Sequence, residues 1–174
     1  MVEISQALIP YGVVALQIIG AILLLALLFD RKGALVTFAG TNAVTLSFLA
    51  TLVAMAGSLF YSNVIGFEPC ILCWWQRIFM YPQVIILFFA VLKKRTDVLL
   101  YTLPLSVLGA GVAIYQMILP ALEKYGVACV SSTGVSCAKL YVFAFGYITI
   151  PVMSLTIFGL LILFAISQKI YAKQ

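Results

Sequence analysis

The sequence predicts an all-α, polytopic membrane protein with five membrane-spanning helices. Three observations support this prediction: the composition, the lengths of the apolar stretches and the placement of the basic residues. Of the 174 residues, 65% are hydrophobic and only 9% are charged, whereas a soluble domain carries about 25% charged residues. So little charge could not cover a globule in water, and the length suits a single integral membrane domain over 1–174.

Five apolar stretches reach the roughly 20 residues that a membrane helix needs. They run over about 7–29, 35–61, 69–92, 98–119 and 147–167. The third stretch is expected to begin a helix at Pro69, because proline is favoured in the first helical turn, and Pro120 bounds the fourth. The chain start lacks the basic residues that open a cleavable signal peptide, so 7–29 is expected to remain as a span.

The basic residues predict the orientation of these spans. Seven of the ten fall on one side, namely Arg31, Lys32, Lys93, Lys94, Arg95, Lys169 and Lys173. Only Lys124 and Lys139 lie in the opposite loops. Because cytoplasmic loops are enriched in Lys and Arg, the C-terminus is expected inside, and the N-terminus and all four cysteines outside. The basic residues form no stripe, so the net charge of +5 does not indicate a nucleic-acid partner.

A Cys-x-x-Cys pair, Cys70 and Cys73, stands at the head of the third stretch. On a helix starting at Pro69, both thiols would lie in the first turn on one face, where the positive helix end favours a thiolate. Arg77 follows one turn deeper. Because a guanidinium inside a span needs a partner or a function, it could stabilise the Cys73 thiolate or bind an oxygen of a lipid-soluble electron acceptor. This pattern favours redox chemistry at a membrane face.

The other two cysteines, Cys129 and Cys137, lie in the loop 120–146 and are separated by a small, polar spacer. A disulfide between them would be open to attack by a thiolate of an outside protein. Two alternatives remain open at this point. The four cysteines could form two structural disulfides in a membrane scaffold or small transporter. They could also bind zinc, although the second spacing fits zinc patterns poorly and the chain has no histidine.

Two further patterns indicate packing rather than chemistry. The aromatic segment 141–147 is expected to lie on the membrane surface and to keep Cys137 near the bilayer. The fourth stretch carries a small-residue face for close helix packing. That face consists of Gly109, Ala110, Gly111 and Ala113.

These motifs resemble the DsbB/BdbC family of bacterial disulfide-bond formation proteins. The matching elements are Pro69-Cys70-Ile71-Leu72-Cys73, Gln76-Arg77, a basic turn, a second loop with two cysteines and a final span. The resemblance implies a four-helix-bundle core over about 35–167, with 7–29 as an additional N-terminal span. It also implies a protein-dithiol:quinone reductase in the plasma membrane of a prokaryote, in contact with membrane lipid and using ubiquinone or menaquinone.

The resemblance further implies a role for each cysteine. A secreted or periplasmic thioredoxin-fold oxidase of the DsbA/BdbD type would attack a Cys129–Cys137 disulfide, with Cys129 as the target. Electrons would then pass to the pair Cys70 and Cys73. Cys73 would reduce the bound quinone, assisted by Arg77.

The remaining candidate quinone-binding residues are Gln76, Tyr115 and Gln116. Some family members carry a histidine near the quinone, and Tyr115-Gln116 occupies about that place in this chain. A histidine proton donor is therefore ruled out. The direction of electron flow stays open, since a protein of this kind could also reduce disulfides outside the membrane.

Overall fold

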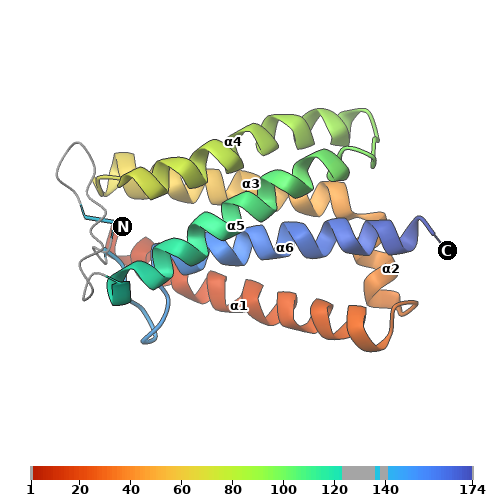
Figure 1. The fold of residues 1–174 in the computed structure, drawn as a ribbon, viewed down its shortest axis with the longest axis horizontal. Helices are drawn as coiled ribbons and strands as arrows, with labels where there is room; N and C mark the ends of the chain where they lie inside the picture. The colour runs from red at the N-terminus through yellow and green to blue at the C-terminus, as the bar shows by residue number, and fades with distance from the viewer. Residues whose placement is uncertain (1, 123–135, 138–140, 174) are drawn as a thin grey trace.

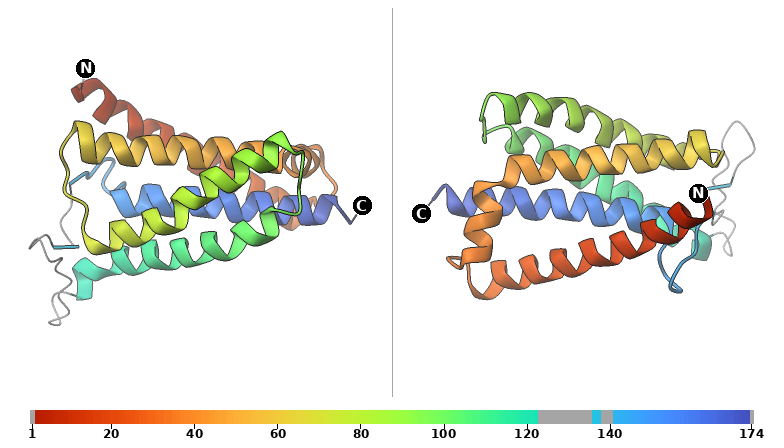
Figure 2. Two further views of the ribbon diagram at one scale, coloured as in Figure 1. Left: turned by 90° about the horizontal axis from the view of Figure 1, so that it is seen from above. Right: turned by 180° about the vertical axis from the view of Figure 1, so that it is seen from behind.

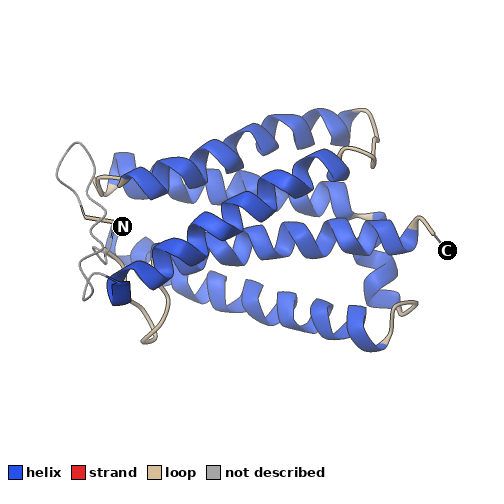
Figure 3. Cartoon of the chain, in the orientation of Figure 1, coloured by secondary structure: helices blue, strands red, loops and turns tan. Residues whose placement is uncertain are grey.

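The structure is a computed structural model that describes residues 2–122, 136–137 and 141–173, with side chains from residue 8 onward. Within these ranges the chain is mainly helical (Figure 3), and an isolated β-bridge joins Ala144 and Ile148. The helices are α1 (Val2–Phe29), α2 (Ala34–Thr41), α3 (Ala43–Leu59), the π-helical turn η1 (Phe60–Val64), α4 (Ile71–Leu92), α5 (Leu99–Leu122) and α6 (Ile150–Tyr171). Five of them, counting α3 with η1 as one, are long and apolar enough to cross a membrane. This confirms the predicted all-α fold with five spans.

Four of the helices form the core of the protein. Helices α3, α4, α5 and α6 make a bundle in which each packs on two neighbours (Figure 1). Helix α1 lies on the outside of this bundle against α6 (Figure 2). The short α2 crosses one end, linking α1 to α3 and packing on α6. The arrangement confirms a four-helix-bundle core with an additional N-terminal helix.

Buried apolar side chains hold the bundle together in two clusters. One cluster, near α2, includes Leu87 of α4, Leu99 of α5 and Phe164 of α6. The other is centred on Phe158 of α6, which is fully buried. Lipid tails are as apolar as these side chains, so close van der Waals packing, rather than escape from water, stabilises the contacts.

The small-residue face predicted on α5 is correct at three of its four positions. A Cβ added at Gly109 would overlap the ring of Phe158, so the two helices approach closely there. Ala110 and Ala113 are buried on the same side. Gly111 is different, because a Cβ there would meet nothing within 4 Å. It lies two residues from Gly109, which is about 200° around a helix of 3.6 residues per turn.

Two helix starts differ from the sequence prediction. The stretch 35–61 is not one helix, because the chain turns at Asn42 (φ −101°, ψ 9°) between α2 and α3. Helix α4 begins at Ile71 rather than at Pro69. The reason is that Cys70 has the extended backbone of an N-cap residue (φ −71°, ψ 173°).

The last two helices also have shifted ends. Helix α5 continues through Pro120, which a membrane helix tolerates when neighbouring groups satisfy the freed carbonyl. Helix α6 begins at Ile150 rather than near Tyr147. Phe145 and Gly146 adopt positive φ angles of 53° and 78°, so a tight turn occupies this segment before the helix can start.

The two ends of the bundle differ in chemistry. One end, termed the cysteine end, carries Cys70, Cys73, Cys137 and the segment 141–149 (Figure 1). The other, termed the basic end, carries the turns 30–33 and 93–98 and the C-terminus, and with them the seven basic residues that the sequence grouped together.

Candidate active site

Cys70 and Cys73 form a pair of free thiols at the start of α4. Cys70 occupies the N-cap position without a side-chain capping bond, and Cys73 lies in the first turn, so the two Sγ atoms lie 3.5 Å apart, with Cys70 donating to Cys73. Cys70 is only 3% exposed. Its hydrogen bond to Cys73 and its burial both raise the pKa of the Cys70 thiol. The proton between the two sulfurs therefore rests on Cys70, and Cys73 is the acceptor.

Cys137 packs directly on this pair. It is disulfide-bonded, 3% exposed, and forms one buried cluster with Cys70 and Leu119 of α5. Cys129, the other loop cysteine of the sequence, lies outside the described residues. A disulfide and a dithiol thus lie in contact, which is the arrangement that thiol–disulfide exchange requires.

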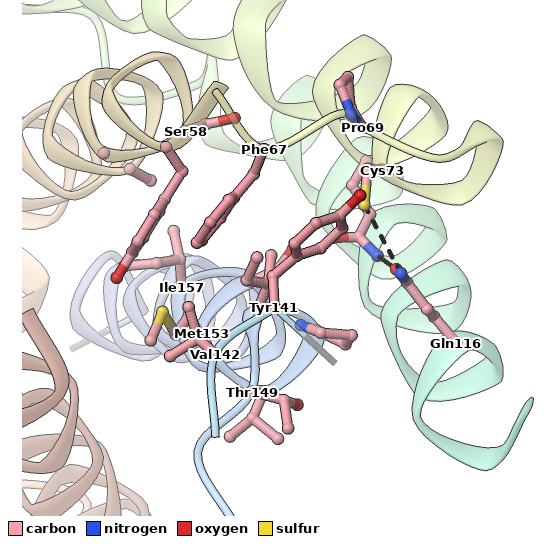
Figure 4. Close-up of a pocket in the computed structure, with 18 of the residues that line it drawn as sticks. Ser58, Phe67, Pro69, Cys73, Gln116, Tyr141, Val142, Thr149, Met153 and Ile157 are labelled. Atoms are coloured by element: carbon pink, nitrogen blue, oxygen red, sulfur yellow. Dashed lines mark hydrogen bonds between the residues drawn. The ribbon is translucent and has the colours of Figure 1, made fainter. Parts of the chain in front are cut away.

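Two buried glutamines connect the cysteines to the bundle. Gln116 of α5 places its Nε2 at 3.5 Å from Cys70 Sγ and from Cys73 Sγ, and at 3.4 Å from the carbonyl oxygen of Cys137. Gln76 of α4 donates to Gln116 Oε1 at 2.7 Å. That bond fixes which end of the Gln116 amide faces the sulfurs (Figure 4). Gln116 is thereby a hydrogen-bond donor to groups of all three described cysteines.

Arg77 is held by α3 rather than by a sulfur. Its Nε donates to Ser58 Oγ at 3.0 Å, and its Nη2 donates to the Ser58 carbonyl oxygen at 3.2 Å. The Tyr81 hydroxyl also donates to Ser58 Oγ, at 3.2 Å. The Trp74 ring lies 5.4 Å from the guanidinium carbon. These contacts stabilise a charge inside a span and hold it on the wall of a cavity that also reaches Cys73.

A cavity of about 740 Å³ begins at the cysteine pair. This volume is within the roughly 300–1,000 Å³ that small-molecule sites occupy. Its lining includes the predicted residues Cys70, Cys73, Gln76, Arg77, Gln116 and Cys137. The rest of the wall is mainly apolar and comes from all five long helices, from η1, and from the segments before α4 and α6 (Figure 4).

Tyr115 is the predicted residue that the structure separates from this group. It is 44% exposed and is not among the described residues that line the cavity. It lies about 100° from Gln116 around α5, since each residue of an α-helix turns by that angle.

An aromatic row on the cavity wall was missed in the sequence. The rings of Tyr61, Phe67 and Tyr141 stack in succession, with centroids 5.8 Å and 4.7 Å apart. Figure 4 shows Tyr141 between Phe67 and the Cys73–Gln116 pair. The only sequence signal was the aromatic segment 141–147, which was interpreted as a membrane-surface anchor. Its depth relative to a bilayer stays a prediction.

Two hydroxyl groups on the cavity wall have no hydrogen-bond partner among the described residues. They are Tyr61 Oη and Ser154 Oγ, both buried. Leaving a buried hydroxyl unpaired costs about 1–3 kcal/mol. Both residues line the cavity, but their hydroxyl oxygens are covered by protein atoms.

Comparison with known proteins matches residues 40–168 to the family model described as disulfide bond formation protein DsbB. The chain is 42% identical over 129 residues to the SPbeta prophage-derived disulfide bond formation protein B of Bacillus subtilis, covering 74% of this chain and 82% of that protein. It is 40% identical over 118 residues to disulfide bond formation protein C of the same organism, covering 68% and 86%. It is 38% identical over 114 residues to a probable disulfide formation protein of Chlamydia pneumoniae, covering 66% and 82%. No solved structure matches the chain.

The matched region begins within α2 and ends within α6. It contains the four bundle helices, the cysteine pair of α4 and the two glutamines, and it leaves α1 outside. The cysteines that meet at one end of this bundle thus lie within the matched range, except that Cys129 is not among the described residues. The chain belongs to the DsbB family of disulfide bond formation proteins.

Proposed function

We propose that this protein is a membrane thiol:quinone oxidoreductase that reoxidises an extracytoplasmic, thioredoxin-fold disulfide donor. One observation carries the proposal. The disulfide of Cys137 packs on the free thiols of Cys70 and Cys73, and those thiols open into a largely apolar cavity. The reduced loop cysteines would thus supply electrons on one side of the Cys70–Cys73 pair, and a ligand in the cavity would accept them on the other side.

The proposed reaction has two exchanges and one oxidation. A thiolate of the partner attacks the loop disulfide at Cys129, and the partner leaves oxidised, with Cys129 and Cys137 as thiols. Those thiols reduce a Cys70–Cys73 disulfide and re-form their own. The state with Cys70 and Cys73 as thiols and Cys137 in a disulfide corresponds to the product of these exchanges. Two electrons and two protons then leave the Cys70–Cys73 pair, and its disulfide is restored.

A quinone in the cavity, ubiquinone or menaquinone, would accept those electrons and protons. The lining fits such a group, because Arg77 places a guanidinium on the same wall as Cys73 and can donate to ring oxygens, while most of the remaining wall is apolar. Cys73 is the proposed electron donor. Its side chain lines the same cavity, and its sulfur accepts the hydrogen bond from the Cys70 thiol.

The proposed partner approaches the cysteine end from outside the cell. The seven basic residues at the opposite end support this orientation, because positive charge is retained on the cytoplasmic side. The protein is a multi-pass membrane protein by its five apolar helices, and the proposed site is the plasma membrane of a prokaryote.

The proposal is tested with purified protein in liposomes, a reduced thioredoxin-fold oxidase and a quinone whose absorbance reports its reduction. Wild type is expected to turn over many times, whereas Cys70→Ser and Cys73→Ser are expected to stop turnover, since neither can form the disulfide. Thr41→Val is the control, because Thr41 lies at the basic end and, among the described residues, bonds only to α2 carbonyls and Asn42.

Two results would contradict the proposal. Turnover that survives in either cysteine variant would exclude the route through this pair. Reduction of the oxidised partner by quinol, at a higher rate than the forward reaction, would reverse the direction and exclude a role as an oxidase.

A further inference from the structure

The additional helix α1 forms part of the cavity wall, although it lies outside the region matched to the family. In the part of α1 whose side chains are described, four residues line the cavity: Ile9, Gly12, Val13 and Leu16. Their spacing of three, four and seven positions places them on one face of the helix. α1 therefore presents a continuous strip to the cavity.

Polar contacts fasten this strip in place. Gln17, one residue beyond it, donates to Thr156 Oγ1 of α6 at 3.1 Å and accepts from the Tyr147 hydroxyl at 2.7 Å. The ring of Tyr11 meets Phe145 edge-on, with centroids 4.9 Å apart. A side-chain amide within a span is costly without partners, so the two bonds of Gln17 favour one position of α1 against α6.

The wall opposite α1 is provided by α3. Its lining residues there are small or apolar: Val53, Ala54 and Gly57. Among the described residues, α1 packs on α6 and α2 and makes at most sparse contacts with α3. The floor between the two helices includes Met153 and Ile157 of α6, which Figure 4 places away from Cys73 and Gln116. We call this apolar part of the cavity, between α1 and α3, the slot.

The cavity thus has two chemically different parts. Its polar part holds Cys73, Arg77 and Gln116, and its apolar part is the slot. A ligand with a ring that carries oxygens and a long hydrocarbon chain matches both parts at once. A ligand without the chain would leave the slot unfilled.

We propose that α1 binds the polyprenyl tail of the quinone in the slot, while the ring lies at Cys73 and Arg77. This rests on the proposed function. It assigns α1, which the family match does not include, as a determinant of which quinones bind. A phospholipid acyl chain has similar apolar chemistry and is the competing occupant that the test separates.

Two glycines on the cavity wall provide the substitutions that test this proposal. A Cβ added at Gly12 of α1 or at Gly57 of α3 would meet nothing within 4 Å, and both residues line the cavity. Gly12→Leu and Gly57→Leu therefore each add a side chain to the cavity wall at a point where its Cβ meets open space. Gly111→Leu is the matched control, since Gly111 is equally open but does not line the cavity.

The measurement is equilibrium binding of two quinones with the same ring, one with a polyprenyl tail and one with a methyl group in its place. Quenching of Trp74 and Trp75, the two tryptophans of the chain, reports binding without turnover. We expect Gly12→Leu and Gly57→Leu to raise the Kd of the tailed quinone about tenfold, or 1.4 kcal/mol. The Kd of the tailless quinone and both Kd values of Gly111→Leu should stay at the wild-type level.

Each other outcome overturns the assignment in a distinguishable way. An equal rise for both quinones would mean that the slot holds the ring. Unchanged binding of both would exclude α1 from the site. Phospholipid that is retained by wild type and lost by Gly12→Leu in native mass spectrometry, with quinone binding unchanged, would identify an acyl chain as the occupant. If wild type bound neither quinone, the proposed function itself would fail.

Discussion

Gln116→Met tests whether the Gln116 amide sets the redox potential of the Cys70–Cys73 pair. The substitution keeps the length of the side chain and removes the Nε2 that lies 3.5 Å from each Sγ. A donor at this place stabilises a sulfur that carries negative charge, which occurs in the reduced pair and not in the disulfide. Its loss should therefore destabilise the reduced form and make the potential more negative.

The magnitude follows from the hydrogen bonds. A hydrogen bond to a charged group contributes about 1.5–3 kcal/mol, and 3.5 Å to sulfur is a long contact, so the lower end applies. For a two-electron couple, about 1.4 kcal/mol corresponds to 30 mV. We expect the potential of the Cys70–Cys73 pair to fall by about 30 mV in Gln116→Met.

The assay is a titration of the purified protein in buffers of known thiol–disulfide potential, with alkylation and mass spectrometry to count reduced Cys70 and Cys73. Gln83→Met is the matched control. Gln83 is a fully buried glutamine of α4, the helix that carries the cysteine pair, and it bonds Ser106 and the Phe79 carbonyl rather than a described cysteine. The Gln83→Met variant should lose a comparable free energy of unfolding and keep the wild-type redox potential of the Cys70–Cys73 pair.

Two results would refute this reasoning. One is an unchanged potential in Gln116→Met, and the other is a shift of equal size in Gln83→Met. Gln116→Met also leaves Gln76 without its acceptor, which costs about 1–3 kcal/mol of stability. The double variant Gln76→Met, Gln116→Met removes that unpaired group, so it should regain part of the stability while the potential stays low.

Three further predictions concern packing, the arginine and the thiols. Gly109→Ala should lower the free energy of unfolding by about 1–3 kcal/mol through overpacking, and Phe158→Leu should reverse part of that loss in a denaturant titration, because the added Cβ meets the Phe158 ring. Ser58→Ala should raise the KM for quinone while leaving kcat nearly unchanged, because Ser58 positions Arg77 and contacts no cysteine sulfur among the described residues; a fall in kcat alone would contradict this. Because the pKa of the Cys70 thiol is raised, Cys70 should react slowly with iodoacetamide at neutral pH. Peptide mass spectrometry should therefore detect labelling of Cys73 before labelling of Cys70.

Much of the fold could be predicted because it depends on local properties of the chain. The length of each apolar stretch sets how many helices can cross a bilayer, and the charges between them mark one end. Where the sequence was misleading, single residues decided the outcome. Asn42 interrupts a stretch that is long enough for one helix, and Cys70, rather than Pro69, supplies the cap of α4.

Part of the site was also predictable, for the same reason. Residues three or four apart on a helix share a face, so Cys70, Cys73 and Arg77 could be grouped from their spacing. The spacing could not show what Arg77 would contact. Its partner Ser58 is 19 positions away on α3, and nothing around that serine distinguishes it in the sequence.

The sequence by itself determined an all-α membrane protein with five spans, an added first helix and a Cys-x-x-Cys pair at a helix start. Only the tertiary structure decided that Gln76 and Gln116, 40 positions apart, meet beside the sulfurs, and that Gln17 joins α1 to Thr156, 139 positions away. The physical reason is that helix geometry is set by backbone bonds within a few residues. Which faces of two helices meet depends instead on how each helix is rotated and packed in the whole bundle.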